Sequence, residues 1–158
     1  MRSVDSNRTL QPVIIMLFMA LIMQLIPISG EWLLWRPNFL LLVMIVWALY
    51  FPEQYSIGFS MMLGLFADLT FSTTLGSHVF IFAVCGAVAN LLHRVVAYLA
   101  LGHRVMIVAL LVLIAELLGA VFGEYIFLWE HIFYVVVMSS LFWIPMDKLV
   151  GKFYRFQK

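Results

Sequence analysis

Six apolar runs follow one another along this chain, with only short polar connections between them. The runs cover residues 13–28, 37–51, 55–71, 77–93, 105–128 and 132–150. Inside lipid, backbone N–H and C=O groups must be satisfied within the segment itself, so such a run folds as a helix. Charged residues make up 11% of the chain, whereas a soluble domain has about 25%. We therefore predict an all-α integral membrane protein, in which residues 1–158 form a single six-helix transmembrane domain.

The second and third runs are compatible with two arrangements in the membrane. Each holds roughly 15 residues, somewhat below the ~20 that a spanning helix needs. They are either two short spans or a re-entrant hairpin over residues 37–71, and both alternatives return the chain to the same side. A cleaved signal peptide over the first run is disfavoured, because Ile28-Ser29-Gly30 is a poor cleavage site.

The distribution of basic residues predicts the orientation. Cytoplasmic segments of membrane proteins carry an excess of Lys and Arg. With six spans and a cytoplasmic N-terminus, Arg36 is the basic residue left on the outer side. The cytoplasmic segments then hold Arg2, Arg8, Arg94, Arg104, Lys148, Lys152, Arg155 and Lys158. We expect both termini to face the cytoplasm.

Small residues and one acid recur at helical spacing in the third run. Ser60, Gly64 and Asp68 lie at i, i+4 and i+8, so a helix places them on one face. Small residues mark the faces where membrane helices pack closely. A carboxylate within lipid is costly and needs a partner. Two interpretations remain open: Asp68 pairs with Arg36 near the outer surface, or it caps the turn at residues 72–76.

The fifth run carries a second stripe of this kind, which comprises Glu116, Gly119, Ala120, Gly123 and Glu124. Glu116 lies near the middle of the run, so we expect it to be the most deeply placed acid. It would form a hydrogen bond to Gln24, Asn90 or a serine, or contact the span of a partner protein. The alternative is a proton or cation site, which is a common use of ionisable residues in membranes.

Signatures of catalysis or cofactor binding are not found in the sequence. Its four histidines lie on different segments and lack the i, i+4 spacing of a helical metal site. Nucleophile, phosphate-binding and dinucleotide-binding motifs are missing as well. We expect no enzyme activity, no cofactor, no metal and no nucleic-acid partner.

Basic and aromatic residues alternate at the C-terminal end. Lys148, Lys152 and Arg155 are interleaved with Phe153, Tyr154 and Phe156. This pattern favours the surface of a membrane that contains anionic lipid. A contact with a cytoplasmic protein is the alternative.

A family resemblance rests on residues 36–78. Arg36-Pro37-Asn38-Phe39 opens the second run, Gly58, Gly64 and Asp68 follow in the third, and Leu75-Gly76 ends the next turn. In these residues, and in its size and short connections, the chain resembles the bacterial rod shape-determining protein MreD family.

The resemblance implies a multi-pass protein of the bacterial inner membrane that acts as a non-catalytic scaffold in the cell-elongation complex. Its expected partners are an MreC-like single-span protein, an MreB-like cytoskeletal protein, RodA with its transpeptidase, and membrane lipids. The residues expected to anchor partners or packing are Arg36, Pro37, Asn38, Gly64, Asp68, Gly76, Glu116 and Glu124. The family is also similar in fold to the substrate-binding subunits of energy-coupling-factor vitamin transporters, so a small-molecule or lipid-binding transporter subunit is the alternative function.

Overall fold

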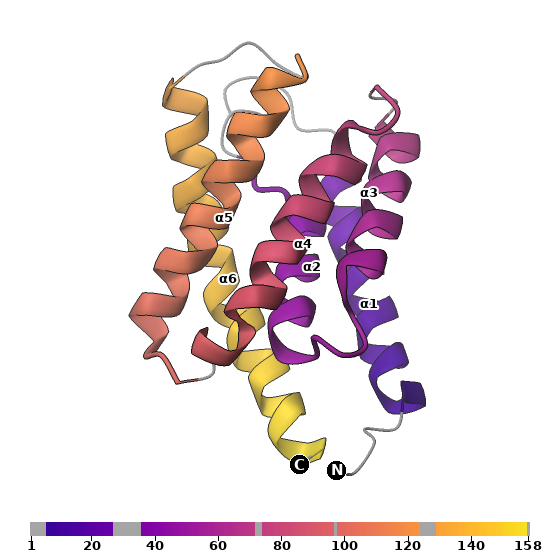
Figure 1. The fold of residues 1–158 in the computed structure, drawn as a ribbon, viewed down its shortest axis with the longest axis vertical. Helices are drawn as coiled ribbons and strands as arrows, with labels where there is room; N and C mark the ends of the chain where they lie inside the picture. The colour runs from indigo at the N-terminus through magenta and orange to yellow at the C-terminus, as the bar shows by residue number, and fades with distance from the viewer. Residues whose placement is uncertain (1–5, 27–35, 72–73, 97, 124–128, 158) are drawn as a thin grey trace.

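The computed structural model describes residues 6–26, 36–71, 74–96, 98–123 and 129–157. These residues form six helices: α1 (Ser6–Leu25), α2 (Phe39–Tyr50), α3 (Ile57–Phe71), α4 (Ser77–Val96), α5 (Leu101–Val121) and α6 (Trp129–Gln157). Successive helices run in opposite directions (Figure 1). We call the end where α1 begins and α6 ends the proximal end, and the end where α3 meets α4 the distal end.

Each predicted run contains a helix, but several helix bounds differ from the prediction. The fifth run was expected to reach residue 128, whereas α5 ends at Val121 because Gly123 turns the chain with a φ of +73°. Pro145 lies inside the sixth run, and α6 continues through this proline. Proline removes one backbone hydrogen bond, and helices in membranes tolerate that loss when their surroundings compensate for it.

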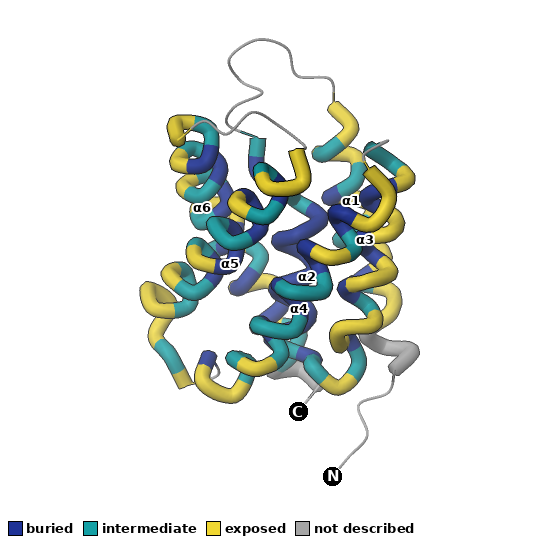
Figure 2. The backbone as a smooth tube through the Cα atoms, turned by 45° about the horizontal axis from the view of Figure 1, so that its top comes forward, coloured by how far each residue is buried: buried dark blue, intermediate teal, exposed yellow. Residues whose placement is uncertain are grey.

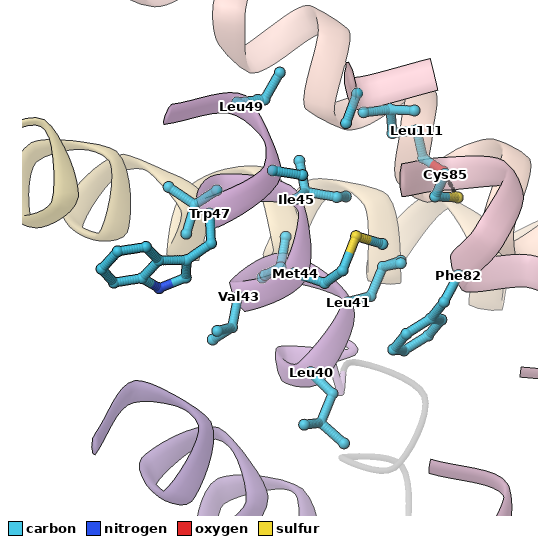
Figure 3. Close-up of a cluster of buried hydrophobic side chains, with 14 of the residues drawn as sticks. Leu40, Leu41, Val43, Met44, Ile45, Trp47, Leu49, Phe82, Cys85 and Leu111 are labelled. Carbon is cyan, nitrogen blue, oxygen red and sulfur yellow. Dashed lines mark hydrogen bonds between the residues drawn. The ribbon is translucent and has the colours of Figure 1, made fainter. Parts of the chain in front are cut away.

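Helix α2 is the core of the bundle. It has 12 residues, which gives a length of about 18 Å. All ten residues from Leu40 to Leu49 are buried, so α2 is enclosed on every side (Figure 2). Their side chains radiate in all directions, and Phe82 and Cys85 of α4 join the same cluster (Figure 3). The sequence could not single out α2, because every run is apolar all round.

The outside of the bundle carries large apolar side chains instead of polar ones. Met62 on α3 is 75% exposed, Leu91 on α4 is 79% exposed and Val121 on α5 is 80% exposed. Exposed apolar patches of this extent fit contact with lipid and not with water. By length and composition, α4, α5 and residues 129–154 of α6 can each cross a membrane, while α2, α3 and the apolar part of α1 are shorter. The fold is that of a helical membrane protein.

Helices α3 and α4 form the closest helix pair. The predicted stripe on α3 is confirmed: Ser60, Gly64 and Asp68 are all buried. A Cβ atom on Gly64 would lie 2.5 Å from the carbonyl oxygen of His78 and 2.6 Å from the Cα of Val79. Only glycine permits this approach. The stripe is therefore covered by α4 of the same chain and is not open to another protein.

Candidate functional site at the distal end

Polar side chains from several helices gather around a pocket of about 230 Å³ at the distal end. We call it the distal pocket. Because successive helices alternate in direction, the ends of α1, α3 and α5 meet the beginnings of α2, α4 and α6 there (Figure 1). The lining residues are Gln24, Arg36, Asn38, Phe71, His78, Ile81, Ala115, Glu116, His131 and Val135.

Asp68 lies just beside the pocket and caps the start of α4. One carboxylate oxygen accepts a hydrogen bond from the Gly76 N–H at 2.8 Å. The other accepts from the His78 N–H at 2.9 Å and from the Ser77 hydroxyl at 3.3 Å, and it lies 3.0 Å from His78 Nδ1. A carboxylate is stabilised at the N-terminus of a helix by unpaired N–H groups and the helix dipole. The interpretation of Asp68 as a turn cap is confirmed.

The other interpretation, an ion pair between Arg36 and Asp68, was wrong. The Arg36 guanidinium donates instead to the carbonyl oxygen of Met23 at 3.2 Å, near the end of α1, while Asp68 is paired with His78. The Nε–H group of Arg36 is buried without a hydrogen-bond partner among the described residues. Partial burial lowers the pKa of Arg36 below its ordinary value, but an arginine remains protonated in a protein. The distal pocket therefore contains a permanent cation.

Glu116 lies in the wall of the distal pocket and faces α6. Its Oε2 atom is 3.7 Å from Nε2 of His131, so the two form an ion pair when the histidine is protonated. We expected Gln24, Asn90 or a serine as the partner, and the fifth run had suggested a position near mid-helix. Because α5 ends at Val121, Glu116 is close to the distal end. Gln24 instead accepts a hydrogen bond from the Phe39 N–H at 3.1 Å.

The remaining predicted residues shape the backbone around the pocket. Asn38 caps α2, with its side-chain oxygen accepting from the Leu41 N–H at 3.1 Å, and Pro37 is buried just before it. Gly76 has a φ of +103°, which favours glycine. Glu124 lies outside the described residues. The structure thus brings Arg36, Asn38 and Glu116 to one pocket and gives Asp68 and Gly76 a role in the adjoining turn.

A second polar cluster at the proximal end was missed by sequence reasoning. Asp147 of α6 is buried. Its Oδ1 atom accepts a hydrogen bond from the Tyr50 hydroxyl at 2.8 Å, and its Oδ2 atom lies 3.6 Å from Arg104. The sequence did carry a signal, because Asp147 is an acid within the sixth apolar run. An acid in such a run needs a partner, as was argued for Glu116. His78 and His131 were missed because histidines were considered only as metal ligands.

The fold and the polar clusters define a class: a helical membrane protein whose buried charges gather at the two ends of the bundle. The chain belongs to the MreD family, since the profile described as rod shape-determining protein MreD matches residues 6–156. The resemblance seen in the sequence is thereby confirmed.

One curated relative carries the same description. The rod shape-determining protein MreD of Haemophilus influenzae is 31% identical over 99 residues, which are 63% of this chain and 61% of that protein. The match thus spans less than two thirds of the relative. No solved structure matches the chain.

Proposed function

We propose that this protein is a non-catalytic scaffold of the bacterial inner membrane that acts in rod-shape determination as part of the cell-elongation complex. The coarse part of the proposal, a role in cell shape, follows from the family. The finer part is that the distal pocket docks an MreC-like single-span protein. The observation that carries it is the gathering of Arg36, Asn38 and Glu116 around one pocket.

All six helices are proposed to cross the membrane, with the proximal end in the cytoplasm. Arg94 lies in the last turn of α4, Arg104 in the first turn of α5, and Lys148 and Lys152 in the last part of α6, so these cations belong to the proximal half. Arg36 precedes α2 and is distal. The course of α2 from the distal to the proximal end, and of α3 back again, favours two short spans over a re-entrant hairpin (Figure 1). A basic cytoplasmic side follows the usual rule for membrane proteins.

The proposed docking depends on polar groups in a site that is partly shielded from solvent. Hydrogen bonds to charged groups contribute more than neutral ones, and a well-packed site away from bulk water strengthens them. The guanidinium of Arg36 and the carboxylate of Glu116 would contact polar groups of the partner where it leaves the membrane. The Gly76 turn lies beside this position. Contacts with an MreB-like protein, and with RodA and its transpeptidase in the wider complex, would then arise through the assembled scaffold.

The size of the distal pocket favours docking over transport of a small molecule. Sites for drug-sized ligands usually measure about 300–1,000 Å³, and the distal pocket has about 230 Å³. A vitamin-binding subunit would need a larger cavity at the outer face. We therefore prefer the scaffold to the transporter subunit.

Co-purification with an MreC-like partner tests the docking proposal. Arg36→Gln and Glu116→Gln should each weaken the complex about tenfold, as expected for charged residues at the centre of an interface. Arg94→Gln removes an exposed cation from the proximal half and serves as the control. Each variant should first be shown to keep the unfolding temperature of the wild type. Equal complex yields from all three variants would contradict the proposal.

The orientation can be tested by labelling with a membrane-impermeant maleimide in a Cys85→Ser background. Thr74 is exposed at the distal end, and Glu53 is exposed in the α2–α3 connection. Each is replaced by cysteine in turn, as Thr74→Cys and Glu53→Cys. We expect the first to react in intact spheroplasts and the second to react only after permeabilisation. Labelling of both in intact spheroplasts would contradict a span formed by α3.

A further inference from the structure

The proximal end contains a pocket that the docking proposal does not use. It has a volume of about 680 Å³ and lies between the end of α2, the beginning of α5 and the last part of α6. We call it the proximal pocket. Its lining residues are Tyr50, Leu101, Arg104, Asp147, Lys148, Gly151 and Lys152.

The inner wall of the proximal pocket is a hydrogen-bonded unit. Arg104 donates to the Tyr50 hydroxyl at 3.1 Å and to the carbonyl oxygen of Leu99 at 3.0 Å. Tyr50 in turn donates to Asp147 at 2.8 Å. Gly151 leaves room for the phenol, because a Cβ there would lie 2.9 Å from the Tyr50 oxygen. The wall therefore holds its polar atoms in fixed positions without any ligand.

The charge around the pocket is not balanced. Three cationic side chains line it, Arg104, Lys148 and Lys152, against the single carboxylate of Asp147. Asp147 is already engaged by Arg104 and Tyr50. Lys148 and Lys152 stand one turn apart on α6, and within the described part of the chain neither forms an ion pair. The residual charge of the lining favours an anion.

The beginning of α5 adds to this preference. Leu101, the first residue of α5, lines the pocket, and the preceding Ala100 provides no side-chain cap. The N-terminus of a helix carries a partial positive charge and unpaired N–H groups. It thus increases the positive potential that the lysines create.

Apolar surface lies next to this basic pocket. Leu101 supplies an apolar edge to the lining. Tyr98 and Leu149 are large and exposed on the flanking segments. An amphipathic ligand could therefore place a charged head in the pocket and its chains along the outside of the bundle. A soluble anion would use only the first of these two features.

We propose that the proximal pocket binds the phosphate headgroup of an anionic phospholipid. Lys148 and Lys152 would contact the phosphate oxygens, as ammonium groups commonly do. The acyl chains would follow the apolar surfaces of α5 and α6. The inference rests on the proposed placement in a membrane but not on docking at the distal pocket, which Arg36→Gln tests separately.

Lipid affinity of the purified full-length chain tests the charge requirement. Native mass spectrometry from detergent would compare phosphatidylglycerol with phosphatidylcholine. We expect phosphatidylglycerol to bind about tenfold more tightly. Lys148→Gln and Lys152→Gln should each weaken it roughly fivefold, as expected for one lysine near an anionic surface. The matched control Arg94→Gln, an equal loss of charge outside the pocket, should change the affinity less than twofold.

A charge-neutral pair of variants tests the pocket itself. Leu101→Trp places a larger side chain in the lining of the pocket and should weaken phosphatidylglycerol binding at least fivefold. Met106→Trp places the same side chain on the exposed side of α5, where Met106 does not line the pocket, and should have no effect. Unfolding temperatures of both variants should equal that of the wild type.

Three results would overturn the proposal. Equal losses with Lys152→Gln and Arg94→Gln would mean diffuse attraction by surface charge. Displacement of the lipid by inorganic phosphate at a similar concentration would assign the pocket to a soluble phosphate compound. Unchanged lipid affinity in the lysine variants, with loss of a co-purified cytoplasmic protein, would make the lysines a protein contact.

Discussion

At the distal end, Asp68 and Glu116 each lie beside a histidine, whereas at the proximal end Asp147 lies beside Arg104 and Tyr50. Asp68 is also held by the backbone, since it accepts hydrogen bonds from two backbone N–H groups. The proximal acid depends on side chains from α2 and α5. Each distal acid is thus paired within one helix hairpin, Asp68 in α3–α4 and Glu116 in α5–α6, while the proximal cluster also brings in Tyr50 of α2, which is far away in the sequence.

This difference suggests that the two ends tolerate change unequally. Removing a buried group that several donors share leaves all of those donors unsatisfied. Removing a group that joins exposed or half-exposed partners costs less, because water can replace it. Unfolding measurements on variants in one detergent can test this ranking.

The largest effect is expected at the distal end. Asp68→Ala should destabilise the protein by about 3–5 kcal/mol, because the Gly76 and His78 N–H groups and the His78 ring lose their acceptor. Asp68→Asn keeps one acceptor oxygen, so its loss of stability should be clearly smaller than that of Asp68→Ala. If Asp68→Ala lost less stability than Asp147→Ala, the proposed ranking would be contradicted.

Asp147→Ala is the matching change at the proximal end. We expect a loss of about 2–3 kcal/mol, since Arg104 and Tyr50 lose a charged partner. Arg104 is partly exposed and also donates to the Leu99 carbonyl, so water and the backbone limit the loss. The exposed Glu53→Ala is the control and should change the stability by less than about 0.5 kcal/mol.

Gly64→Ala tests the close contact within the distal hairpin. The added methyl group would collide with the backbone of His78 and Val79, and overpacking of this kind costs about 1–3 kcal/mol. Gly58→Ala is the matched control on the same helix, because a Cβ there meets nothing within 4 Å. That variant should be neutral or slightly stabilising, since alanine favours a helix over glycine. Equal stabilities of the two variants would mean that α3 and α4 separate easily.

Tyr50→Phe should have the smallest effect, a loss of about 1 kcal/mol. It removes one hydroxyl that donates to Asp147 and accepts from Arg104, while the direct contact between those two charges remains. Tyr98→Phe is the control, as Tyr98 is 93% exposed. A loss as large as that of Asp147→Ala would show that Tyr50, and not Arg104, is the main partner of the acid.

The sequence allowed much of the fold to be predicted and rather less of the site. Apolar runs locate helices because lipid demands satisfied backbones, and the spacing of Ser60, Gly64 and Asp68 identified the packed face of α3 correctly. Partner choice was harder: Asp68 lies beside His78 rather than Arg36, since capping a nearby helix needs only a short turn. The Asp147 cluster joins three distant segments, and no local spacing records such contacts.

The enclosed position of α2 also bears on the bilayer. A helix of about 18 Å exposed to lipid would force the hydrocarbon layer to thin around it, at a cost that grows with each ångström of mismatch. Here the ten residues from Leu40 to Leu49 meet only protein. The thickness of membrane that this protein would match is therefore set by the outer helices, whose apolar side chains are exposed, and not by α2. The length of α2 is not constrained by the bilayer and can instead suit its packing against the other helices and the positions of the two polar clusters.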